Sequence, residues 1–240
     1  MNAQEAQTAL HEIHEIFGRH SLVVWLDCGT LLGAVRDGKF IPWDNDIDLG
    51  IWIDDLDAID KKELWRNLNR CEFNIYLLAD KLILERKGVP INISLYFKDG
   101  DRARRAIYPL DTHLLSTAAR VLWWVSHARR QTSDVLLRWP RSIGSFTKRL
   151  LVTGYEILPG PFTERIQPMI CSLCKTAGCV DIDWNVPLHY FTTFEQMDFF
   201  GDQWSVPMDY KKYLEFRFGL DWRVPRKNFS TVLEDGAVKR

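Results

Sequence analysis

The acidic residues Asp46 and Asp48 stand two positions apart at the start of the alternating run Asp46 to Ile53. Side chains at positions i and i+2 of a β-strand project from the same face, so these two carboxylates are expected close together. Neighbouring like charges repel and raise a pKa unless a cation lies between them. Carboxylate oxygens suit Mg²⁺ or Mn²⁺, which also bind substrate phosphates. The pair therefore predicts a divalent-metal site, and the alternative is two acids on the solvent face of an edge strand.

Residues that could bind a phosphate lie just upstream of this pair. Gly29 and Thr30 follow a β-rich run, where the backbone can approach a phosphate closely and offer amide donors. Arg36 and Lys39 come next, in the intervening loop, and can neutralise a diphosphate. Asp44 opens the acidic run, and both a direct role and a loop or capping role are open to it.

Hydrophobic periodicity indicates the elements that hold these residues. Helices are predicted over 4–18, 31–35 and 54–70. Strands are predicted over 21–28, 46–53, 73–78, 82–85 and 91–97. The pattern favours an α/β fold (α+β, with a mixed sheet) in a single domain of 240 residues.

The chain is predicted to have three parts within its single domain. Residues 1–100 form the predicted catalytic core, and residues 101–185 form a predicted basic helical insertion. Within it, residues 101–149 hold 10 basic and 3 acidic side chains. Residues 186–240 are expected to pack back on the core, with a helix from Asp209 to about Phe218 that Gly219 ends. The basic segment is interpreted as a helical lid, with peripheral contact to anionic lipid as the alternative.

Two sequence motifs point to a known family. The run GTLLGAVR, followed by FIPWDNDIDLG, resembles the signature of the LicD family, which includes fukutin-related protein. A second resemblance lies near the C-terminus, with Phe218 in place of the usual Tyr. Its pieces are Phe200-Gly201, Val206-Pro207, Tyr213-Leu214, Phe218-Gly219, Asp221-Trp222 and Pro225. Together the similarity covers roughly residues 20–100 and 186–228.

The resemblance implies a nucleotidyltransferase-like fold and a metal-dependent phosphotransferase. Such an enzyme moves phosphocholine or a polyol phosphate from a CDP-linked donor to a cell-surface glycan or a lipid-linked glycan precursor. Gly29 and Thr30 would contact the donor phosphate, Asp46 and Asp48 would act as catalytic metal ligands, and Mg²⁺ or Mn²⁺ would be the cofactor.

One position departs from the family pattern. Relatives usually carry Ile-Asp-Ile on the next core strand, where this chain has Ile91-Asn92-Ile93. The Asn92 carbonyl oxygen can bind a metal but brings no charge and cannot act as a base. Three interpretations stay open: a site with two carboxylates, a weakened site, or a substitute acid. Asp27, Asp111 and His189 are the candidates for that substitute.

Composition limits the other functions. The net charge of -1 lacks the basic excess of a general nucleic-acid binder. The first 20 residues lack a basic segment followed by an apolar stretch, so no signal peptide is expected. No run of 18 apolar residues occurs and the five cysteines are odd in number, so a cytoplasmic location is expected. Cys171, Cys174 and Cys179 are interpreted as core thiols, with a zinc site as the alternative.

Two rival functions are also compatible with the motifs around Gly29, Thr30, Asp46 and Asp48. A nucleotidyltransferase would transfer NMP from an NTP to a small hydroxylated acceptor, and it would leave the C-terminal motif unexplained. The other rival, which Asn92 motivates, is a non-catalytic or catalytically weakened nucleotide-binding module.

Overall fold

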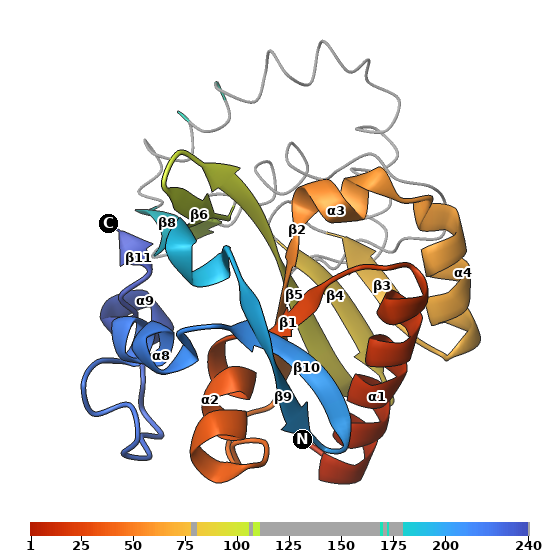
Figure 1. Ribbon diagram of the computed structural model, residues 1–240, viewed down its shortest axis with the longest axis horizontal. Helices are drawn as coiled ribbons and strands as arrows, with labels where there is room; N and C mark the ends of the chain where they lie inside the picture. The colour runs from red at the N-terminus through yellow and green to blue at the C-terminus, as the bar shows by residue number, and fades with distance from the viewer. Residues whose placement is uncertain (78–80, 106–107, 111–168, 170–171, 173–179, 240) are drawn as a thin grey trace.

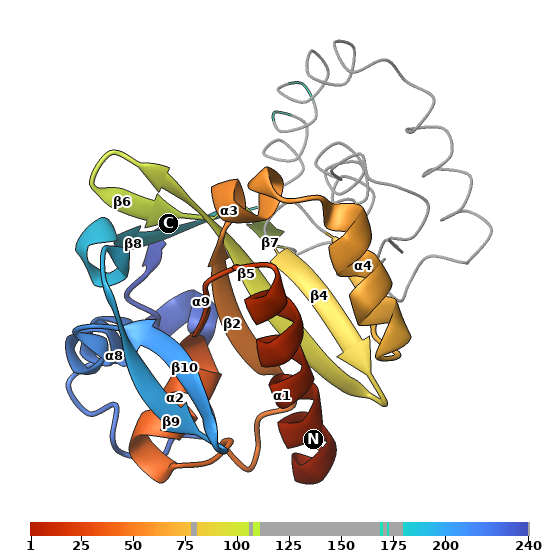
Figure 2. The same ribbon diagram turned by 45° about the vertical axis from the view of Figure 1, so that its right-hand side comes forward.

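The computed structural model describes all residues except 78–80, 106–107, 111–168, 170–171, 173–179 and 240. One mixed sheet runs through the described part of the chain, in the order β11-β8-β6-β5-β2-β1-β10-β9. Figures 1 and 2 show helices packed against both faces of its central strands. The α/β class with a mixed sheet is therefore confirmed.

Four central strands carry the core of the sheet. They are β1 (Val24–Leu26), β2 (Ile47–Trp52), β5 (Val89–Asp99) and β10 (Asp202–Pro207). Strand β2 pairs in parallel with β5 and antiparallel with β1, and β1 pairs in parallel with β10. The C-terminal segment thus completes the sheet begun by the N-terminal one.

The remaining strands extend the sheet on both sides. They are β3 (Asn74–Leu77), β4 (Lys81–Arg86), β6 (Arg102–Arg104), β7 (Tyr108–Leu110), β8 (Val180–Pro187), β9 (Phe194–Phe199) and β11 (Val238–Lys239). The predicted hairpin of residues 73–85 is confirmed, because β3 and β4 pair antiparallel. The described ends of the segment 101–185 include β6, β7 and most of β8, where a helical insertion is predicted. The middle of that segment, with Asp111 and Cys171, Cys174 and Cys179, lies outside the described residues.

The opening helix α1 (Ala3–Arg19) matches its prediction. Its apolar face, which includes Leu10, Ile13 and Phe17, is buried against the sheet. The side chain of Asn2 accepts hydrogen bonds from the backbone N–H groups of Gln4 and Glu5, which caps the helix.

The prediction of a single helix over 54–70 is wrong. The structure has two helices, α3 (Ile53–Ala58) and α4 (Lys61–Arg70), separated by extended backbone at Ile59. Asp60 starts the second helix, because its side chain accepts a hydrogen bond from Lys62 N. A local capping residue therefore divides a segment whose apolar spacing alone predicts one continuous helix.

Helix α2 (Cys28–Asp37) begins earlier than predicted. Asp27 is its N-cap, so Gly29 and Thr30 lie in the first helical turn instead of at a strand end. Gly38, with φ of 62°, ends the helix in the left-handed conformation that glycine favours. The first turn of α2 thus faces the start of β2.

The predicted C-terminal helix is confirmed as α8 (Tyr210–Phe218), followed by Gly219. A 3₁₀ helix, η1 (Leu188–Phe191), and a short helix, α9 (Thr231–Glu234), complete the described elements. Among the described residues, no helix combines the length and apolar character needed to cross a membrane.

Candidate active site

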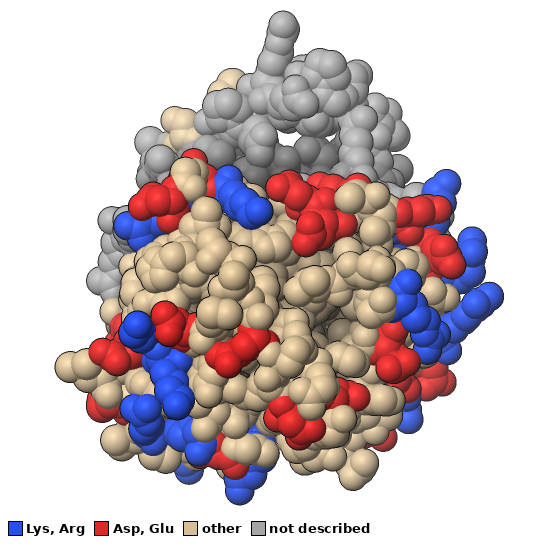
Figure 3. All heavy atoms as spheres, in the orientation of Figure 1, with Lys and Arg blue, Asp and Glu red and all other residues tan. Residues whose placement is uncertain are grey.

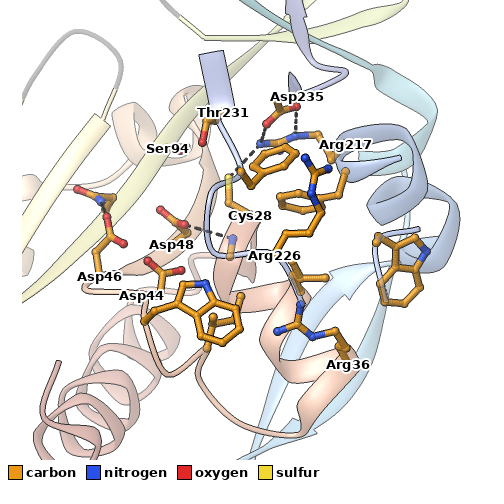
Figure 4. A pocket seen from close by; sticks show the side chains of 18 of the residues that line it. Cys28, Arg36, Asp44, Asp46, Asp48, Ser94, Arg217, Arg226, Thr231 and Asp235 are labelled. Atoms are coloured by element: carbon orange, nitrogen blue, oxygen red, sulfur yellow. Dashed lines mark hydrogen bonds and ion pairs between the residues drawn. The ribbon is translucent and has the colours of Figure 1, made fainter. Parts of the chain in front are cut away.

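Three aspartates meet where the loop after α2 enters β2. Asp48 lies on β2, Asp46 just precedes it, and Asp44 lies in the loop. One carboxylate oxygen from each lies within 4.8 Å of the other two. Figure 4 shows the three side chains together along one side of a pocket. The predicted proximity of Asp46 and Asp48 is therefore confirmed, and Asp44 is the third carboxylate.

Crowding raises the pKa of two of these acids. Burial, together with a hydrogen bond to Asp46 and its charge, raises the pKa of Asp44 to about 7. Burial, and then the charges of Asp46 and Asp44, raise the pKa of Asp48 to about 7. Near neutral pH, the metal-free cluster therefore retains protons that a bound cation would displace.

Helix α2 holds Asp48 in place through two contacts. The backbone N–H of Gly29 donates to Asp48 Oδ2 at 3.3 Å. The Thr30 hydroxyl accepts from the backbone N–H of Asp48 at 2.8 Å, and the Thr30 side chain is buried. Thr30 does not line the pocket, so its predicted contact with donor phosphate is replaced by a contact that fixes β2.

A side chain at Gly29 would crowd the acidic cluster. A Cβ at Gly29 would lie far inside van der Waals distance of Asp44 Oδ2 and 3.4 Å from Asp48 Oδ2. The absence of that carbon lets Asp44 and Asp48 approach the amide end of α2, where the helix dipole favours negative charge.

Asn92 orients one of the acids. It lies beside Asp48 in the parallel register of β2 and β5, and its Nδ2 donates to Asp46 Oδ2 at 2.6 Å. An aspartate here would repel Asp46, whereas the amide holds it. Of the substitutes predicted for this position, Asp27 is fully buried outside the pocket lining, and His189 lines a separate cleft.

The acids line a cavity of about 480 Å³. Cations line it too, and Figure 4 shows Arg36 and Arg226 on the side away from the three aspartates. The basic lining residues are Arg36, Lys81, Arg105, Arg217, Arg226 and Lys227. The cavity therefore brings an acidic cluster and a cationic wall together.

The two cations predicted to bind phosphate differ in position. Arg36 lies in helix α2 and lines the cavity, where it also forms an ion pair with Asp37 at 2.7 Å. Lys39 is exposed and does not line the cavity, because the chain turns away after Gly38. Sequence reasoning missed Arg226 and Lys227, which line the cavity. Their position directly after Pro225, the last residue of the C-terminal motif, was the signal that could have indicated them.

A buried polar network joins the two ends of the chain behind the site. Asp27 accepts hydrogen bonds from Tyr96 Oη at 2.7 Å and from Tyr213 Oη at 2.5 Å. Arg217 donates to Tyr213 Oη at 2.5 Å and pairs with both carboxylate oxygens of Asp235 at 2.7 and 2.6 Å. All five side chains are buried, so the N-cap of α2 is fixed by residues from the C-terminal segment.

The described cysteines, Cys28 and Cys71, are free thiols. Burial raises the pKa of Cys28 well above its usual value, so its thiol stays protonated at neutral pH. It accepts a hydrogen bond from Arg217 at 3.3 Å and contributes packing to the site.

The sequence matches known proteins over part of its length. Residues 21–133 match the family described as LicD/FKTN/FKRP, nucleotidyltransferase domain. Ribitol 5-phosphate transferase FKRP of Homo sapiens and of Mus musculus is 59% identical over 32 residues, which is 13% of this chain and 6% of either relative. The uncharacterized protein RP689 of Rickettsia prowazekii is 41% identical over 46 residues, or 19% of this chain and 17% of that protein. The chain thus aligns with less than a fifth of these curated relatives.

Among solved structures, the antibiotic-resistance factor ANT(2'')-Ia aligns at 15% identity. The alignment covers 73% of this chain and 96% of that structure, with a TM-score of 0.35. A crystal structure of ANT(2")-Ia with adenylyl-2"-tobramycin aligns at 16% identity over 69% of this chain and 97% of that one, with a TM-score of 0.32.

Proposed function

Because residues 21–133 match the LicD/FKTN/FKRP nucleotidyltransferase domain family, we propose that the chain is a metal-dependent phosphotransferase. It moves a phospho-substituent, of the phosphocholine or polyol phosphate type, from a CDP-linked donor to a glycan or a lipid-linked glycan precursor. The observation that carries the proposal is the clustering of Asp44, Asp46 and Asp48 in a cavity that is also lined by cations.

The donor set fits a hard divalent cation. Three carboxylates have oxygens within 4.8 Å of one another, and burial and mutual repulsion raise the pKa of Asp44 and Asp48. Mg²⁺ or Mn²⁺, held by Asp44, Asp46 and Asp48, would neutralise charge that develops on the phosphates. Asn92 would act through Asp46, which it holds by a hydrogen bond.

The cationic wall suits a diphosphate. Arg226 and Lys227 are exposed residues of the lining, and Arg226 also forms an ion pair with Glu234, whereas the Arg36 side chain on helix α2 is buried. Guanidinium and ammonium groups bind phosphate oxygens through charge-assisted hydrogen bonds. In this proposal the core of residues 1–100 supplies the three clustered acids, and residues 186–240 supply three of the six lining cations, Arg217, Arg226 and Lys227.

The proposed reaction is a substitution at phosphorus in which the acceptor oxygen replaces CMP. The acceptor hydroxyl oxygen forms a bond to the phosphorus that bears the substituent, the bond from that phosphorus to the CMP oxygen breaks, and the hydroxyl proton is released. The chain's own residues position the groups in line and neutralise the diphosphate, which is the larger part of catalysis in phosphoryl transfer. Asp46 and Asp48 are the proposed catalytic residues.

The proposal is tested by incubating the protein with Mn²⁺, candidate glycan acceptors and one donor at a time. The donors are CDP-glycerol, CDP-ribitol, CDP-choline and a panel of NTPs. Release of CMP that depends on metal and acceptor is expected. Asp48→Asn should abolish it, and the exposed Asp198→Asn should not. Release of pyrophosphate from an NTP would instead identify the rival nucleotidyltransferase, and tight CDP binding with no turnover in any mixture would identify a binding module.

A further inference from the structure

The aromatic side chains of the cavity share an unusual feature. Those among the described lining residues are Trp43, Trp184, Phe218, Trp222 and Phe229. Each has the charged group of a Lys or Arg over its ring, between 4.0 and 5.9 Å from a ring centroid. The pairs are Lys227 over Trp43, Arg105 over Trp184, Arg217 over Phe218, Arg223 over Trp222 and Arg226 over Phe229.

This covering bears on the recognition of ligand cations. A quaternary ammonium group is typically bound by the open faces of several aromatic rings. Here Lys227 lies over Trp43 at 5.5 Å, and Arg226 lies over Phe229 at 5.7 Å. A ligand cation would have to approach rings that already carry a positive charge, so it would be repelled.

A ligand ammonium group could also be bound by a carboxylate, but the described lining has no open carboxylate outside the three clustered aspartates. Beyond the three clustered aspartates, the only acidic lining residue described is Asp235. Both of its oxygens are bound by Arg217, and Oδ1 also accepts from Ala237 N at 2.9 Å. An ammonium group therefore finds no open acid outside the proposed metal site.

The charge of the cavity leads to the same conclusion. Six Lys and Arg side chains line it, against four Asp side chains. Figure 3 shows basic side chains gathered over α8 and the loop that follows it, and Arg223, Arg226 and Lys227 in that loop are exposed. Their N–H groups are donors only, so they match hydroxyl and phosphate oxygens and not a methylated ammonium.

We infer that the cavity selects CDP-linked donors whose transferred phospho-substituent is an uncharged, polyhydroxylated group, and that it discriminates against phosphocholine. The inference rests on the proposed function. Polyol hydroxyls accept hydrogen bonds from Lys227 and from the N–H groups of Arg226 that its ion pair with Glu234 leaves over, whereas a trimethylammonium group offers these donors no acceptor.

Calorimetric titration of the protein at fixed Mn²⁺ with CDP, CDP-glycerol, CDP-ribitol and CDP-choline tests this inference. We expect CDP-glycerol and CDP-ribitol to bind at least as tightly as CDP, and CDP-choline to bind at least tenfold more weakly than CDP-glycerol. A smaller difference, or tighter binding of CDP-choline, overturns the inference while leaving the proposed function intact. If not even CDP binds in a metal-dependent way, the proposed function fails first.

Variants test the cause of the discrimination. Lys227→Gln and Arg226→Gln uncover Trp43 and Phe229, so the ratio of the CDP-choline to the CDP-glycerol dissociation constant should fall several-fold, even if both donors bind more weakly. Lys211→Gln is the matched control, because Lys211 Nζ lies 5.8 Å over the ring of Tyr210 and neither residue lines the cavity. A ratio unchanged in both cavity variants would overturn the proposed role of the covering charges.

Discussion

The hydroxyl of Tyr213 lies 2.5 Å from Oδ1 of Asp27, across 186 positions of sequence. Both side chains are buried, and Asp27 is the N-cap of the helix whose first turn contacts Asp48. The C-terminal motif therefore meets the N-terminal one inside the protein. This contact gives a physical reason for two distant sequence motifs to occur together.

Removal of one hydroxyl from this contact should destabilise the protein. Tyr213→Phe leaves a lone pair of Asp27 and a donor of Arg217 without their partner, and a buried unsatisfied polar group costs about 1–3 kcal/mol. Urea unfolding should show a loss of that size. Tyr210→Phe, on the same helix with no hydrogen bond to the network, is the control, and equal losses in both variants would contradict the account.

Gly29→Ala should damage the acidic cluster while leaving the fold in place. The added Cβ would collide with Asp44 Oδ2, so the Asp44 carboxylate must shift from its place in the cluster. We expect Mn²⁺ affinity to fall at least tenfold. Gly18→Ala, in helix α1 with no atom within 4 Å of the added carbon, should leave Mn²⁺ affinity unchanged and stabilise the helix by up to about 1 kcal/mol.

Metal binding should depend on pH with a defined sign. The pKa values of Asp44 and Asp48 are raised to about 7, so the metal-free folded protein binds protons that the unfolded chain releases near pH 4. Stability of the metal-free protein should therefore fall as pH rises from about 4 through 7. The metal competes with these protons, so its affinity should weaken by roughly tenfold per pH unit below 7 for each proton displaced.

Melting curves from pH 5 to 8, with and without Mg²⁺, check this prediction. The metal-free melting temperature should decline toward pH 8, and Mg²⁺ should raise it most at the alkaline end. Asp48→Asn should flatten both trends. Stabilisation by Mg²⁺ that is as large at pH 5 as at pH 8 would rule out proton displacement from these acids.

The sequence contains enough to predict the acidic pair but not the other residues that line the cavity with it. The alternation of Asp46 to Ile53 determines which side chains share a face, so the proximity of Asp46 and Asp48 follows from local pattern. The role of Asp44 depends on the path of a loop, which has no period. The places of Arg226 and Lys227 in the cavity lining depend on the return of the C-terminal segment to the sheet, a long-range contact that local pattern does not encode.

The ends of the helices also could not be predicted from apolar spacing alone. Capping by Asp60 divides a helix that apolar spacing alone joins, and capping by Asp27 extends α2 over Gly29 and Thr30. The role of Thr30 then changes, because a side chain in the first helical turn reaches the neighbouring strand. Recognition of the two N-caps in the sequence would have corrected both elements.

Asn92→Asp is the sharpest probe of how the site is built. The amide of Asn92 donates to Asp46 at 2.6 Å, so an aspartate would replace that hydrogen bond with repulsion in an already acidic cluster. We expect the metal-free melting temperature to fall, Mn²⁺ to restore more stability than in the parent protein, and turnover to fall because Asp46 loses its orientation. Asn92→Ser, which keeps a donor without a charge, should retain more activity than Asn92→Asp. If Asn92→Asp is instead the faster enzyme, a fourth carboxylate was limiting, and the amide is not the group around which Asp46 is positioned.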